Sequence, residues 1–269
     1  MPRHCTMSWW RFPPQTREVQ FDEKWSFVGK KQKNCDPADP ADAEQGSTWD
    51  HVAFDPEHRL VVSVVTGKRT AEKVETLVQD FQQRTGSRAM NLMTSDEYPP
   101  YKGAILKVYG EEVVPPRTGR PGRPRAAYKV PPPDLKYATV HKTRKKGRVV
   151  KVDLRVVFGT IVAVMLALAQ SLVSTAINTA FIERQHGTDR NRSARKARRS
   201  YCFSKQWEVH EAVTYFTMYS YNFCWVVRTL REKDGEGRWR QRTPAMATGL
   251  TDHIWQLSEW LTYPAVQRK

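Results

Sequence analysis

The chain has 269 residues, which is enough for one large domain or two small ones. Because 39% of the residues are hydrophobic and 11% are aromatic, the chain can build a packed core, and wholesale disorder is excluded. A formal net charge of +16 favours a polyanionic partner such as nucleic acid, although membrane-surface and ribosome-associated proteins are also basic.

The first half of the chain alternates between strand and helix patterns. Residues 1–16 have no clear period and predict an irregular arm, whereas alternating apolar residues over 17–31 predict a strand. After a Pro- and Ala-rich loop, the strands Trp49–Phe54 and Leu60–Val65 are expected to form a hairpin. A helix over 70–84 follows, with its first residue as the N-cap.

The second half of the chain continues this pattern and ends in helices. The expected elements are a strand ending at Asp96, a helix over 101–109, a Pro/Arg-rich loop over 113–135, strands over 137–142 and 149–158, and helices over 177–199 and 207–230. This order indicates an α/β domain with a mixed sheet and helices on both faces. Periodicity alone leaves several α/β folds open.

The segment from Val156 to Ile182 has no charged residue and is long enough to span a bilayer. Its continuous apolar part, 161–169, is much shorter, and polar residues interrupt the remainder. Both flanks are basic, so charge indicates no membrane orientation. We therefore expect a buried strand end, a core helix and a loop, with a membrane span as the alternative.

The cysteines and the N-terminus indicate a cellular location. No CxxC or zinc-finger spacing connects the four cysteines, Cys5, Cys35, Cys202 and Cys224, so they are expected to be free thiols in a reducing cytosol. The chain does not start with basic residues and an apolar run, which predicts no signal peptide. A cytoplasmic, nucleoid-associated location is expected.

Three carboxylates occupy positions that suit metal binding. Asp22 lies inside the first predicted strand, Asp96 ends the fourth, and Glu183 lies on a late helix. Carboxylates at strand ends of one sheet can converge with one from a packed helix. Such a cluster suits two hard divalent cations that act on a phosphodiester. The alternative is a strand-edge aspartate and a solvated helix glutamate at ordinary surface positions.

Several stretches agree, in order, with one family over residues 17–260. They are NTAFIERQHGTDR at 178–190, VQFDEKWSFVGKKQKNC at 19–35, LMTSDEYPPY at 92–101, FSKQWEVHEAVTYF at 203–216, YNFCWVVRTL at 221–230 and TPAMATGLTDHIW at 243–255. Together they resemble bacterial insertion-sequence transposases of the insertion-sequence-one type. His186 stands where these relatives usually have Asn, and the stretch 160–169 is more hydrophobic than their usual polar helix.

This resemblance implies a ribonuclease H-like mixed sheet flanked by helices, with a helical C-terminal extension. It gives Asp22, Asp96 and Glu183 the roles of a DDE triad that binds Mg²⁺ or Mn²⁺, as two ions. The implied activity is cleavage of double-stranded DNA at element ends and strand transfer into target DNA, by a homodimer or larger assembly on paired ends. The implied domains are an arm at 1–16, a catalytic domain at 17–230 with a basic insertion at 113–148, and an extension at 231–269.

A run of basic residues is expected to contact DNA phosphates. The set comprises Arg190, Arg192, Arg195, Lys196, Arg198 and Arg199, together with Lys205, Lys142 and Lys145. Arg190 lies seven residues after Glu183 and therefore on the same helix face. The alternative is a solvated charge run. The Arg-Pro stretch 119–125 resembles a minor-groove hook, or is a basic surface loop. His210 and Glu211 either support the site or form a surface pair.

Two other classes of function remain open from the sequence. The chain could be a non-catalytic, basic DNA-binding protein derived from a decayed transposase, or a small membrane protein. For the transposase, residues 1–16 are too short for a helix-turn-helix and hold one cysteine, which cannot make a zinc site alone. Recognition of element ends is then expected from a separate or upstream domain.

Overall fold

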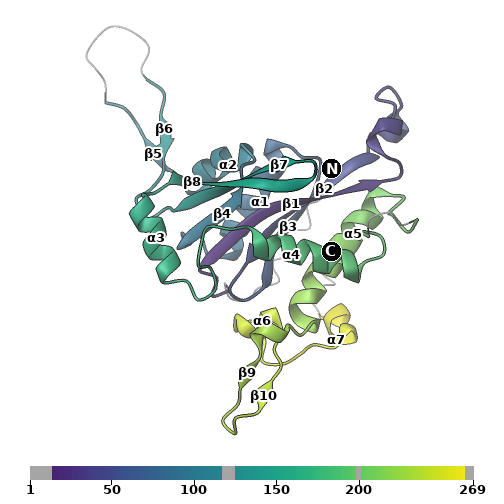
Figure 1. The fold of residues 1–269 in the computed structure, drawn as a ribbon. Helices are drawn as coiled ribbons and strands as arrows, with labels where there is room; N and C mark the ends of the chain where they lie inside the picture. The colour runs from purple at the N-terminus through teal and green to yellow at the C-terminus, as the bar shows by residue number, and fades with distance from the viewer. Residues whose placement is uncertain (1–13, 117–124, 198–200, 264–269) are drawn as a thin grey trace.

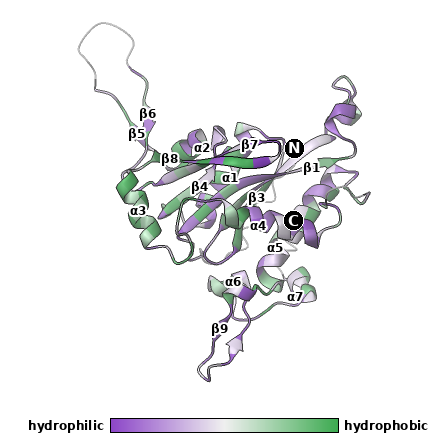
Figure 2. Ribbon diagram, in the orientation of Figure 1, coloured by the Kyte–Doolittle hydropathy of each residue, from purple (hydrophilic) through white to green (hydrophobic). Residues whose placement is uncertain are grey.

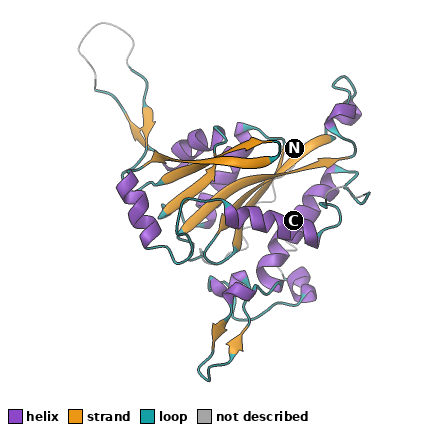
Figure 3. Cartoon of the chain, in the orientation of Figure 1, coloured by secondary structure: helices purple, strands orange, loops and turns teal. Residues whose placement is uncertain are grey.

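A mixed six-stranded sheet forms the centre of the molecule (Figures 1 and 3). The computed structural model describes residues 14–116, 125–197 and 201–263. In the spatial order β3-β2-β1-β4-β7-β8, the strands are β3 (Leu60–Gly67), β2 (Gly46–Asp55), β1 (Glu18–Val28), β4 (Leu92–Asp96), β7 (Tyr137–Lys145) and β8 (Arg148–Phe158). β1 pairs in parallel with β4, as β4 does with β7, while β2, β3 and β8 join through antiparallel pairs.

The connections follow from the same order. An antiparallel meander of β1, β2 and β3 leads into α1 (Ala71–Arg84), which crosses over to β4, and α2 (Pro100–Tyr109) then connects β4 towards β7. This meander, followed by helical crossovers to parallel strands on the other side of β1, is the ribonuclease H-like arrangement. The fold class expected from the sequence is confirmed.

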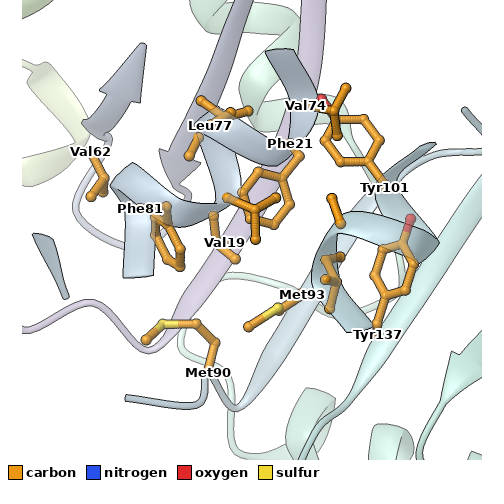
Figure 4. Close-up of a cluster of buried hydrophobic side chains, with 14 of the residues drawn as sticks. Val19, Phe21, Val62, Val74, Leu77, Phe81, Met90, Met93, Tyr101 and Tyr137 are labelled. Carbon is orange, nitrogen blue, oxygen red and sulfur yellow. The ribbon is translucent and has the colours of Figure 1, made fainter. Parts of the chain in front are cut away.

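The two faces of the sheet carry separate hydrophobic clusters, because successive strand residues point to opposite sides. On one face, Phe21 packs edge-on against Phe81 of α1, with ring centroids 5.5 Å apart, and Tyr101 of α2 joins them (Figure 4). On the other face, Val52 packs with Ile182 and Met218 of two later helices. α4 (Ala180–Arg192) and α5 (Trp207–Cys224) therefore cover the second face.

The C-terminal residues pack against the end of α5. Tyr219 and Phe223 of α5 form a cluster with Ala245 and Trp260. The elements here are the 3₁₀ helix Arg228–Leu230, β9 (Glu232–Lys233), β10 (Trp239–Arg240), α6 (Pro244–Ala247) and α7 (Leu257–Thr262). The remaining short elements are the 3₁₀ helices Gln32–Asn34 and Pro40–Asp42 and the hairpin of β5 (Glu111–Val113) and β6 (Tyr128–Val130).

Two local expectations need correction. The segment 113–148 is not one insertion, because β7 from Tyr137 onward is a central strand between β4 and β8. The helix expected over 177–199 is shorter, since α4 spans Ala180–Arg192. The Arg-Pro stretch and the arm lie largely outside the described residues, which omit 1–13 and 117–124.

The apolar helix α3 (Ile161–Ala169) is only partly a core helix (Figure 2). Val164 and Ala167 are buried against Leu92 and Ala138 of the sheet. Its other side is solvent-exposed, through the side chains of Ile161, Val162, Met165 and Leu166. Within the described part of the chain, no helix combines the length and apolar character needed to cross a membrane.

Candidate active site

Two neighbouring parallel strands bring the first two predicted aspartates together. Phe21 of β1 is in register with Ser95 of β4, so Asp22 and Asp96 follow at the same level of the sheet. One carboxylate oxygen from each, with one from Glu23, form a group within 4.8 Å of one another. Convergence of Asp22 and Asp96 was expected; the part taken by Glu23 was not.

Glu183 enters the same cleft from the first turn of α4. The cleft has a volume of about 780 Å³. The Glu183 carboxylate accepts a hydrogen bond of 2.7 Å from Thr179 Oγ1 and forms an ion pair with Lys142 Nζ. In the described structure, Glu183 is not within the 4.8 Å carboxylate group. The cleft therefore holds all three predicted acidic residues, with the third bound to a lysine.

The carboxylates of the cleft repel one another. Burial, and next the charge of Asp22, raise the pKa of Asp96 to about 6, although Arg69 opposes the shift. Burial and the charge of Asp96 raise the pKa of Glu23 to about 7. A divalent cation would relieve this repulsion, and an all-oxygen donor set suits Mg²⁺ or Mn²⁺. The residues present thus fit the expected metal ions.

Arg69 and His186 also contact these carboxylates. Arg69 Nη2 lies 3.1 Å from Glu23 Oε2 and 3.7 Å from Asp96 Oδ2, and its guanidinium stacks 3.9 Å from the ring centre of Tyr98. His186 Nδ1 lies 3.3 Å from Asp22 Oδ2. Sequence reasoning missed Arg69 because nothing in the local pattern before α1 connects it to the sheet edge. The adjacency of Glu23 to Asp22 was the signal for that residue.

The predicted DNA-binding residues lie in different environments. Lys142 and Arg190 line the acidic cleft, while Arg195, Lys205 and Lys145 are exposed. Arg192 instead packs between α4 and α5, where Nη1 donates a 2.9 Å hydrogen bond to the carbonyl of Thr217. Arg198 and Arg199 lie outside the described residues.

Lys196 was expected to contact a DNA phosphate, but its side chain is buried in a network of charges beneath α4. The network consists of Lys24, Asp50, Asp189, Lys196 and His210. Lys196 Nζ lies 3.2 Å from Asp50 Oδ2 and 3.1 Å from Asp189 Oδ2, and Lys24 pairs with the same two aspartates. Two aspartates hold Lys196 in the interior, so the sequence-based prediction that this lysine contacts DNA is wrong.

This buried network fixes α4 to the sheet and to α5. His210 Nε2 of α5 lies 3.0 Å from Asp50 Oδ1, and Thr217 Oγ1 donates a 2.7 Å hydrogen bond to Asp189 Oδ1. Burial alone would raise the pKa of Asp50, but Lys196 and Lys24 hold it well below its usual range. His210 is therefore part of the buried network that holds α4, the helix that carries Glu183, and does not form a surface pair. Its neighbour Glu211 accepts a hydrogen bond from Thr66 Oγ1 at 3.1 Å.

Fold and cleft together define an α/β protein with a ribonuclease H-like sheet and an acidic site where the parallel pairing of β1 with β4 ends. Neither a family model nor a curated protein matches the chain. Among solved structures, it is similar to the Mos1 transposase paired-end complex with left transposon end. The match has 20% sequence identity and a TM-score of 0.22, and covers 34% of this chain and 33% of that chain. The fold assignment rests on strand order and connections.

Proposed function

We propose that this chain is the catalytic domain of a DDE transposase that cleaves DNA at element ends and joins the freed end to target DNA. The observation that carries the proposal is the meeting of Asp22 and Asp96, from adjacent parallel strands, in a cleft that also receives Glu183. The sequence stretches that resemble insertion-sequence-one transposases contain all three residues. Lys142 and Arg190 on the cleft wall supply positive charge for a phosphate backbone.

In this proposal, Asp22, Asp96 and Glu183 hold two Mg²⁺ or Mn²⁺ ions. Such ions, when bound, activate a water or a 3′-hydroxyl and stabilise the leaving oxygen of a phosphodiester. Asp22 would be central to this site, since one of its carboxylate oxygens lies within 4.8 Å of one from Glu23 and one from Asp96. Metal binding by Glu183 would release Lys142, which lines the same cleft, to contact a DNA phosphate. Arg69 keeps Glu23 and Asp96 in place through its ion pairs with their carboxylates.

The proposed partner is double-stranded DNA, bound by a dimer or larger assembly on paired ends. Exposed Arg195, Lys205 and Lys145 would contact the backbone beyond the cleft. Arg198 and Arg199 remain predictions of the sequence. End recognition would come from a separate or upstream domain, as for a catalytic module whose contacts are mostly to phosphates.

A nicking assay on supercoiled plasmid tests this function. With Mg²⁺ or Mn²⁺ we expect conversion to open circles, and with EDTA none. Asp22→Asn, Asp96→Asn and Glu183→Gln should each abolish nicking while plasmid binding stays nearly unchanged, because affinity comes from lysine and arginine. Glu236→Gln, an exposed carboxylate in the β9–β10 turn, is the matched control. Binding without nicking by the parent chain would favour a non-catalytic DNA-binding protein.

A further inference from the structure

A second hollow lies next to the acidic cleft and shares a wall with it. Its volume is about 550 Å³, within the usual range for ligand sites. Arg190 lines both the cleft and this hollow. The other lining residues come from the second half of β1, from Lys31 just after it, and from the chain that follows α4. A ligand in the hollow would therefore lie beside whatever occupies the cleft.

Four aromatic side chains line this hollow: Trp25, Phe27, Tyr201 and Phe203. The ring centres of Phe27 and Phe203 are 4.6 Å apart, and those of Trp25 and Phe27 are 5.9 Å apart. Trp25 is 46% exposed even though its indole N–H already donates to Ser47 Oγ at 3.1 Å. Exposed rings with satisfied polar groups offer their faces, which is what a stacking ligand uses.

Cations surround these rings. Lys31 and Arg195 are exposed and line the hollow with Arg190. Lys205 Nζ lies 3.0 Å from the ring centre of Phe203. An uncharged apolar peptide would use only the rings and an aliphatic chain offers no flat face to stack on them, whereas a nucleotide uses both parts, its base on the rings and its phosphate on the cations. Charge complementarity therefore selects a nucleic-acid strand.

The distance along β1 indicates where this strand comes from. Trp25 follows Asp22 by three residues, which is about 10 Å of extended chain and close to three base steps of a duplex strand. Bases inside a duplex are stacked on each other and cannot reach protein rings. We propose that the hollow binds an unpaired nucleotide of the DNA strand whose phosphodiester lies in the acidic cleft. This inference rests on the proposed function, because it names the form of DNA that the site takes.

Binding of short oligonucleotides in EDTA tests the inference without any cleavage. The probes are a fluorescein-labelled dT₁₂ single strand and a 12-base-pair duplex. Trp25→Ala should weaken single-strand binding about 10- to 100-fold, as loss of one base–aromatic stack does, and change duplex binding less than about twofold. Trp239→Ala is the matched control, since Trp239 is exposed on β10 beside Arg231. Equal losses for both probes, or no loss, would overturn the inference.

A second measurement guards against a misfolded variant. The parent chain, with 2-aminopurine at one position of a single strand, should change the fluorescence of that base on binding, and Phe203→Leu should reduce the change. No change in the parent chain would also reject the inference. Its failure is separable from that of the proposed function. Plasmid nicking with unselective single-strand binding rejects the hollow alone, and selective single-strand binding without nicking rejects the catalytic role alone.

Discussion

The cleft between the middle of β1 and the end of β4 and the buried network beneath α4 both draw on β1, and each contains two aspartates. In the network, Asp50 and Asp189 each pair with the two lysines Lys24 and Lys196. In the cleft, Asp22 and Asp96 face each other and Glu23. Neighbouring positions on one strand therefore supply a charge-balanced cluster and an acidic one.

The pKa directions record this difference. Burial raises the pKa of a carboxylate in either cluster. In the network, the two lysines outweigh burial and lower the pKa of Asp50 and of Asp189. In the cleft, burial and the charge of Asp22 raise the pKa of Asp96 to about 6. Removing one member of a charge-balanced buried cluster is strongly destabilising, whereas unrelieved repulsion between carboxylates is characteristic of a functional site.

Removing a charge from the network should produce the largest loss of stability. Asp189→Asn leaves the buried ammonium groups of Lys24 and Lys196 with one aspartate, so we expect the free energy of unfolding to fall by about 3–5 kcal/mol. Urea denaturation measures this. Asp153→Asn, which breaks an ion pair with the exposed Lys151, is the control and should leave the free energy of unfolding nearly unchanged. Similar small losses in both variants would show that the network is not a structural unit.

Adding metal should stabilise the protein through the cleft alone. Mg²⁺ or Mn²⁺ at about 100 times its dissociation constant should raise the free energy of unfolding by about 2.7 kcal/mol, seen as a higher melting temperature. Ca²⁺ should also stabilise the fold, yet not support nicking, because it is larger and tolerates irregular coordination. Asp96→Asn should lose most of the metal effect. An equal effect in that variant would place the bound ion elsewhere.

Sequence periodicity was sufficient for most of the fold. The hairpin over 49–65, the helix capped by Thr70 and the strand ending at Asp96 could be predicted, because each has an apolar period and clear ends. The misassigned segments lack one of these signals. β7 was divided between a strand and an insertion, since its second half reads HKTRK and turns basic where it lines the cleft.

The site could be predicted only in part, because residue type does not encode direction. Asp22, Asp96 and Glu183 could be located from their places on predicted strands and a helix and from family resemblance. Lys196 could not be separated from its exposed neighbour Arg195, because both belong to one basic run and only tertiary packing buries one of them. The two aspartates that hold Lys196 are Asp50 of β2 and Asp189 of α4, which are far from each other in the sequence.

Relieving the repulsion in the cleft should stabilise the metal-free protein. Asp96→Asn removes a carboxylate whose pKa is raised by burial and by the charge of Asp22. The free energy of unfolding should therefore increase by about 1 kcal/mol at pH 7.5, after allowance for the partial exposure of this side chain. Because folding raises the pKa of Asp96 from 3.8 to about 6, the charge penalty builds up between those two pH values and is constant at higher pH. The gain should therefore shrink as the pH is lowered towards 4. Destabilisation at pH 7.5 would mean that Asp96 is held by attractive contacts, as Asp50 is.

The smallest expected effect on stability is that of Arg195→Ala, and the adjacent Lys196 provides the contrast. Arg195 is exposed, so Arg195→Ala should leave stability within about 0.5 kcal/mol and lower the slope of log affinity against log salt by about one unit. Lys196 is buried between Asp50 and Asp189, so Lys196→Ala should destabilise the fold instead.

Fluorescence anisotropy with a 30-base-pair duplex at several NaCl concentrations gives the slopes, and urea denaturation gives the stabilities. The slope is the informative quantity, because each lost phosphate contact releases about one counterion fewer whatever the sequence of the DNA. An unchanged slope for Arg195→Ala would mean that this side chain faces solvent in the complex. A reduced slope for a stably folded Lys196→Ala would mean that the lysine leaves its aspartates to reach DNA, and the contrast between the two clusters would then disappear.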